Sequence, residues 1–91
     1  MATFVMLGKY SSESLREASK DRTSRSISLI EEKGGRLKAM YALLGGWDLC
    51  MVTEFGNVDD ALAASVELNK STGIAFNTLP AVAVAEFDNL L

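Results

Sequence analysis

The segment "LLGGWDLC", residues 43–50, gathers several residues that can do chemistry. It holds the only tryptophan, Trp47, and the only cysteine, Cys50, with Asp48 between them and two glycines before the ring. A carboxylate can accept hydrogen bonds from turn amides or pair with a cation, and an indole ring offers a large flat surface. Two interpretations are therefore open for this segment, a turn and a ligand site.

The chain contains no histidine, which limits the chemistry open to it. Histidine is the commonest general base near neutral pH and the commonest transition-metal ligand, so we expect no metal site and no cofactor. Acid–base catalysis would need a shifted pKa at one of the remaining groups, which are Asp48, Glu54, Tyr10, Tyr41 and Cys50. A single cysteine forms no internal disulfide, and we expect the reducing cytoplasm as the compartment.

Arg22 has an unusual place in the predicted first helix. Stepping about 100° per residue puts it near the middle of a sheet-facing stripe. That stripe consists of Leu15, Ala18, Ser19, Arg22, Ser26, Leu29 and Ile30. An arginine there must snorkel, pair or line a cavity, and we expect Asp48 or Glu54 as its carboxylate partner. The alternative is an anion-binding group in a pocket between helix and sheet, because a planar guanidinium suits carboxylate or phosphate.

Two tyrosines extend this hypothesis. Tyr10 and Tyr41 can line the same cavity as Trp47, or they can fill the core with their hydroxyls reaching the surface. Aromatic walls with one arginine suit a planar or anionic small molecule. The predicted ligand-binding set is Arg22, Tyr10, Tyr41, Trp47 and Asp48.

The helices and strands that must position these residues can be predicted from the hydropathy pattern and from the residues that start or end such elements. Ser11 or Ser12 can cap the first helix, Gly34 and Gly35 can end it, and Asn57 can cap the second. The expected order is strand 3–10, helix 11–33, strand 36–44, strand 48–55, helix 57–70, strand 74–84 with Pro80 marking an edge or interruption, and a last short helical turn in "EFDNLL". This β-α-β-β-α-β order predicts one α+β domain over residues 1–91, with a ferredoxin-like four-stranded antiparallel sheet and two helices on one face.

The predicted strands are apolar on both faces. Phe4 and Met6 point one way and Val5 and Leu7 the other, whereas a sheet covered on one face should alternate apolar and polar. The helices can cover only one face, and "EFDNLL" is too short to cover the second. We therefore expect a two-fold, sheet-to-sheet homodimer.

Composition excludes several partners. Hydrophobic residues make up 48% of the 91 residues, which is generous for a small monomer. The net charge of −3, with Lys and Arg scattered, argues against nucleic acid and an anionic membrane as partners. "MATFVMLGKY" lacks the basic region of a signal peptide, and no transmembrane span is present.

Five stretches of the chain are similar to one known family: the tripeptide Gly46-Trp47-Asp48, "FVMLGKY", "DRTSR", "GGRLKAMYALLGGWDL" and "TLPAVAVAEF". On these residues the chain resembles the GYD domain family, named for a Gly-Tyr-Asp tripeptide between the two central strands. The resemblance covers essentially the whole chain. It implies a dimeric α/β-barrel protein that pairs sheet to sheet, and it implies no particular activity. It also suggests an aromatic lid, or a staple against the partner subunit, at Trp47, and the missing tyrosine hydroxyl argues against proton transfer there.

Three function classes follow from these observations. The first is a small homo-oligomeric module that binds a small anionic or aromatic molecule. The second is a cofactor-independent enzyme, monooxygenase- or isomerase-like, acting on such a molecule, by analogy with fold relatives alone. The third is an assembly role, in which dimers build larger rings; it would be marked by a second apolar surface outside the barrel and no cavity. An open pocket with two convergent polar groups would favour the enzyme.

Overall fold

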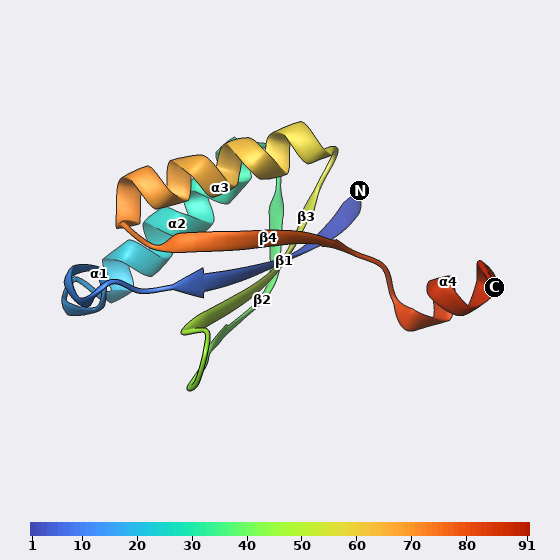
Figure 1. Cartoon of the computed structure of the whole chain (residues 1–91). Helices are drawn as coiled ribbons and strands as arrows, with labels where there is room; N and C mark the ends of the chain where they lie inside the picture. The colour runs from blue at the N-terminus through green and yellow to red at the C-terminus, as the bar shows by residue number, and fades with distance from the viewer.

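The computed structural model describes all 91 residues and has a single four-stranded sheet. Its elements, in chain order, are β1 (Ala2–Lys9), α1 (Ser12–Arg16), α2 (Lys20–Glu32), β2 (Arg36–Ala42), β3 (Leu49–Phe55), α3 (Val58–Thr72), β4 (Ala75–Ala81) and α4 (Val84–Asn89). The strands are antiparallel in the order β2-β3-β1-β4, and α2 and α3 lie on one face of the sheet (Figure 1). The predicted ferredoxin-like α+β fold is confirmed.

The core lies between this sheet and the two long helices. Alternate residues of the central strands point into it, so that Met6 pairs with Met51 across β1 and β3 on the buried side. The rings of Phe4 and Phe55 meet edge to face, with their centroids 6.0 Å apart. Ala61 and other small residues on α3 let that helix approach the sheet closely. The helices contribute the buried residues Ile30, Ala61, Ala64 and Leu68.

The prediction of one continuous helix over residues 11–33 was wrong, because two serines each start a helix. The side chain of Ser11 caps α1 in a capping box with Ser14. Ser19 has an extended backbone (φ −160°, ψ 161°), and its side chain accepts the N–H of Arg22 at 3.0 Å to begin α2. Serine hydroxyls compete with helical hydrogen bonds and favour such caps. The helix ends as predicted before Gly34, which has φ 82°.

The second face of the sheet is apolar and uncovered. Val5 stands between Val52 of β3 and Leu79 of β4 in the strand register, and Leu7 pairs with Cys50. No helix of the chain lies on this side (Figure 1). Dimerisation through it remains a prediction.

The two edge strands of the sheet, β2 and β4, are shorter than predicted. β2 ends at Ala42 and β4 at Ala81, so the expected strands 36–44 and 74–84 are each too long. β4 is an edge strand, as Pro80 indicated, because proline donates no hydrogen bond to a neighbouring strand. The predicted helical turn near the end is confirmed in α4, which lies apart from the sheet (Figure 1).

Candidate functional site

Arg22 is buried on the sheet side of α2, with 7% of its surface exposed. Its Nη1 donates a hydrogen bond to the carbonyl oxygen of Ser14, and its Cζ lies 5.4 Å from the centroid of the Tyr10 ring. The carbonyl is available because the last carbonyls of a helix have no partner inside it, and Ser14 belongs to the five-residue α1. Arg22 therefore joins α1 to α2 and stacks on Tyr10 through a cation–π contact.

The prediction that Asp48 or Glu54 pairs with Arg22 was wrong. The only ion pair in the chain joins Lys9 Nζ to Asp48 Oδ2 at 4.0 Å. Glu54 follows the buried Thr53 on β3, so it points to the opposite face of the sheet. The helix break explains the difference, because it brings the Ser14 carbonyl to the guanidinium.

The cavity beside Arg22 is small. It has a volume of about 20 Å³ and is lined by Ser26 of α2, Met40 and Phe76 of the sheet, and Tyr10 just after β1, among others. That volume holds about one water molecule, so an organic ligand does not fit here. The pocket that the sequence suggested between helix and sheet is therefore nearly filled.

Asp48 fastens the connection between β2 and β3 to the end of β1. Its Oδ2 accepts the backbone N–H of Tyr10 at 2.8 Å, and its own N–H donates to the carbonyl of Gly8 at 2.9 Å. Its carbonyl accepts the N–H of Leu43 at 2.9 Å, which closes the loop. Gly45 has φ 129°, a conformation that suits glycine. Gly45 and the backbone of Asp48 thus form the turn between β2 and β3, while the Asp48 carboxylate bonds outside it, to Tyr10.

Trp47 lies at an open hollow at the end of the sheet. This Trp47 hollow has a volume of about 570 Å³ and is lined by Lys9, Gly46, Trp47, Ala75, Phe76 and Asn77. The lining thus combines the indole with an ammonium group and a side-chain amide. Lys9 donates to the carbonyl of Gly46 at 3.0 Å, and 52% of its side chain is exposed.

The structure divides the predicted ligand set into three parts. Arg22, Tyr10 and Asp48 lie together, with the backbone and ring of Tyr10 between the two charges. Trp47 forms the second part and lines the Trp47 hollow. Tyr41 is 60% exposed on the edge strand β2, opposite Cys50 on the uncovered face, and lines neither cavity.

Sequence reasoning missed Lys9 and Asn77. Both stand two residues from an apolar residue of the uncovered face, Lys9 after Leu7 and Asn77 before Leu79. A polar residue that interrupts an apolar strand face near its end was the available signal.

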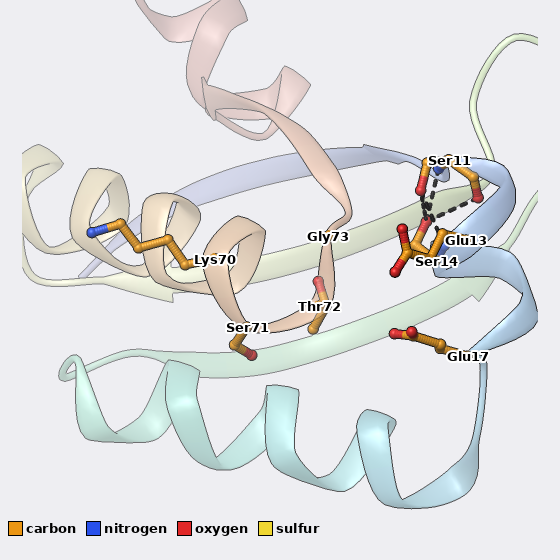
Figure 2. Close-up of a pocket in the computed structure, with 8 residues that line it drawn as sticks. All are labelled: Ser11, Glu13, Ser14, Glu17, Lys70, Ser71, Thr72 and Gly73. Carbon is orange, nitrogen blue, oxygen red and sulfur yellow. Dashed lines mark hydrogen bonds between the residues drawn. The ribbon is translucent and has the colours of Figure 1, made fainter.

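A second, polar hollow lies between α1 and the end of α3. It has a volume of about 250 Å³ and is lined by Ser11, Glu13, Ser14, Glu17, Lys70, Ser71, Thr72 and Gly73. Figure 2 shows the carboxylates of Glu13 and Glu17 pointing across the gap toward α3, while Lys70 extends away along that helix. The Thr72 hydroxyl is already bonded to Leu68 and Ile74. Without an apolar wall, this hollow is a poor organic-ligand site.

Fold and site together define a ferredoxin-like chain with an uncovered apolar sheet face and an aromatic, cationic hollow at one end. The family model of the GYD domain matches residues 4–91, and the chain belongs to the GYD domain family. Comparison with curated proteins and with solved structures gives no significant match. None of the helices has the length and apolar character needed to cross a bilayer.

Proposed function

We propose that this GYD domain protein is a homo-oligomeric binding module that takes a small, planar, anionic molecule into the Trp47 hollow. The observation that carries the proposal is the lining itself, where an indole ring, an ammonium group and an amide meet in one opening of about 570 Å³. That volume lies within the range of small-molecule sites. The ring would stack on the ligand, and the polar groups would hold its charged end.

The two polar groups suit an anion. The exposed ammonium of Lys9 is a compact point charge with three donors. It uses one donor on Gly46 and lies 4.0 Å from Asp48 Oδ2, so two donors are left for a ligand. The Asn77 side chain can add a further donor. A planar carboxylate or a small phosphate ester would satisfy both groups while its apolar part covers Trp47 and Phe76.

The homodimer is supported by the apolar uncovered face. Val5, Leu7, Val52 and Leu79 lie on it, and no element of the chain covers them. Burying about 600 Å² of apolar surface per chain would contribute on the order of 15 kcal/mol before the costs of association. The Trp47 hollow shares Lys9 and Asn77 with the end of this face, so a stacked partner would narrow its opening.

The hollow is open and holds two polar groups, Lys9 and Asn77, which is the feature that would favour an enzyme. Binding still ranks ahead of catalysis because of the rest of the lining. Lys9 is the only titratable side chain in its lining, so an acid–base pair would have to come from the ligand or the partner. We further propose the cytoplasm as the compartment, since the single cysteine, Cys50, is a free thiol in the sheet.

Trp47 fluorescence tests the proposal directly, because it is the only tryptophan. We expect benzoate and phenyl phosphate to change the emission saturably below about 10 mM, and neutral benzamide to bind about tenfold more weakly. The variant Lys9→Met should abolish this preference for anions. A linear response that is equal for benzoate and benzamide would contradict the proposal. Native mass spectrometry of the freshly purified protein would report the subunit number and any retained ligand together.

A further inference from the structure

The last ten residues form an exposed apolar segment. We call residues 82–91 the C-terminal arm; it contains α4, and none of its residues is buried. Val84 is 72% exposed and Phe87 is 50% exposed, and Val82, Leu90 and Leu91 are also open to solvent. Figure 1 shows the arm beyond the end of β4, turned away from α2 and α3.

The arm lacks the means to stabilise its own helix. α4 has six residues, and its N-cap, Ala83, makes no side-chain hydrogen bond. Isolated helices of this length are not stable in water without tertiary packing. The arm therefore needs a surface that covers Val84 and Phe87 and that accepts its two carboxylates, Glu86 and Asp88.

The free edge of β2 has the complementary character. Arg36 and Lys38 are both exposed on this strand, and neither takes part in an ion pair within the chain. Glu54 of β3 stands opposite Arg36 in the strand register. The two cations near the start of β2 outnumber this carboxylate and match the two carboxylates on the arm.

The sheet order shows which copy supplies that edge. In the order β2-β3-β1-β4, the arm leaves from one edge and β2 forms the other, three strand spacings or roughly 14 Å away. A two-fold axis that runs parallel to the strands between two stacked sheets reverses the strand order. It therefore places β2 of one copy over β4 of the other, next to the start of the arm.

We propose that the arm of each protomer lies along the β2 edge of a second copy, with Glu86 and Asp88 facing Arg36 and Lys38. The apolar side chains of the arm then lie against the start of β2, and the exchange is reciprocal because the assembly is two-fold. This inference rests on the homodimer of the proposed function and is independent of the ligand. Its surface lies outside the Trp47 hollow.

Charge reversal tests the pairing. The variants are Glu86→Lys with Asp88→Lys on the arm, Arg36→Glu with Lys38→Glu on β2, and all four together. Glu31→Lys with Glu32→Lys, at exposed sites on α2, is a control with the same charge change as the arm variant. Analytical ultracentrifugation gives the dimer Kd for each. We expect each reversed pair to raise the Kd about tenfold, the fourfold variant to restore it to within about threefold, and the control to leave it unchanged.

Three outcomes would overturn the proposal in different ways. A Kd unaffected by the arm variant removes the arm from the interface, while the dimer itself stands. If the increases in Kd caused by the arm variant and by the β2 variant add in the fourfold variant, the arm does not pair with β2. A wild-type protein that stays monomeric at about 100 μM removes both the dimer and the arm exchange. Circular dichroism verifies folding, which these exposed substitutions should preserve.

Disulfide trapping distinguishes an arm that lies on the partner's β2 from an arm that folds back onto its own sheet. In a Cys50→Ser background, one protein carries Lys38→Cys and another carries Asp88→Cys. Mixed under oxidising conditions, they should form a disulfide heterodimer, and the matched partner Ser24→Cys on α2 should not. When both cysteines are placed in one chain, a fast-migrating cross-linked monomer as the main product would show that the arm folds onto its own sheet, against the proposal.

Discussion

The carboxylate of Asp48 accepts the backbone N–H of Tyr10 at 2.8 Å, across 38 positions of the chain. This bond joins the connection between the edge strand β2 and the central strand β3 to the point where β1 ends. The Tyr10 ring in turn lies against the Arg22 guanidinium on α2. Asp48 and Arg22 therefore hold one end of the sheet from two sides, without touching each other.

Removal of the Asp48 carboxylate should lower stability. Asp48→Ala leaves the Tyr10 N–H without its acceptor, and we expect a loss of about 1–3 kcal/mol in the free energy of unfolding. Asp48→Asn keeps an acceptor oxygen and should lose about 1 kcal/mol or less. Urea denaturation measures both, with the exposed Glu32→Gln as a control. Equal stability of Asp48→Ala and wild type would show that water replaces this acceptor.

Arg22 should matter for folding and not for ligand affinity. Arg22→Met removes the bond to the Ser14 carbonyl and the stack on Tyr10, and we expect a loss of about 2–3 kcal/mol in unfolding free energy. The exposed Arg25→Met on the same helix should change it by about 0.5 kcal/mol or less. Calorimetric titration with benzoate should give the same Kd for folded Arg22→Met as for wild type. A large rise in that Kd would restore Arg22 to the binding site.

The fold could be predicted from the sequence because its signals were redundant. Apolar runs, the glycines after residue 33 and the Asn57 cap all indicated the same order of elements. The break between α1 and α2 was missed because Ser19 stands inside a continuous helical pattern. Only its extended backbone shows that its side chain caps a new helix. A serine gives the same sequence signal on a helix surface as it does at a cap.

The candidate site was less predictable, since it depends on contacts between distant segments. Helical periodicity correctly placed Arg22 toward the sheet, but it could not show that a backbone carbonyl rather than a carboxylate would receive it. Tyr41 and Tyr10 are both strand-end tyrosines, yet one lies on a free edge and the other over the core. Strand order separates them, and strand order does not follow from the local pattern.

Two glycines offer a matched pair of tests for close packing. A Cβ at Gly35 would lie 2.3 Å from the ring of Phe55, which is fully buried, whereas a Cβ at Gly46 has no neighbour within 4 Å. Gly35→Ala should therefore cost about 1–3 kcal/mol in unfolding free energy through overpacking. Gly46→Ala should stay within about 0.5 kcal/mol of wild type. Thermal denaturation compares the melting temperatures of the two variants. Similar melting temperatures would mean that the Phe55 ring can shift to make room for the added methyl group.

The uncovered sheet face should respond to a single charge. Val52→Lys places an ammonium beside Val5 in the middle of this face, where the monomer leaves it solvated and a stacked partner would bury it. We expect the dimer Kd to rise at least about a hundredfold while the monomer keeps its circular dichroism spectrum. Ser24→Lys, on the exposed side of α2, should leave the Kd unchanged. An unaffected Kd for Val52→Lys would place the interface elsewhere.

Trp47 separates ligand binding from folding most directly. The ring lines the open hollow and makes no side-chain hydrogen bond, so Trp47→Ala should change the unfolding free energy by about 1 kcal/mol or less. It should weaken benzoate binding at least tenfold, because a stacking surface and its apolar contact are lost. Trp47→Tyr gives the Gly-Tyr-Asp tripeptide of the family and keeps a flat ring, so its Kd should stay within about fivefold of wild type. Calorimetry is the suitable measurement, since these variants have no tryptophan emission. If Trp47→Ala bound as tightly as wild type, the hollow would not be the site. If Trp47→Tyr bound as weakly as Trp47→Ala, the site would depend on the indole itself and not on a general aromatic surface.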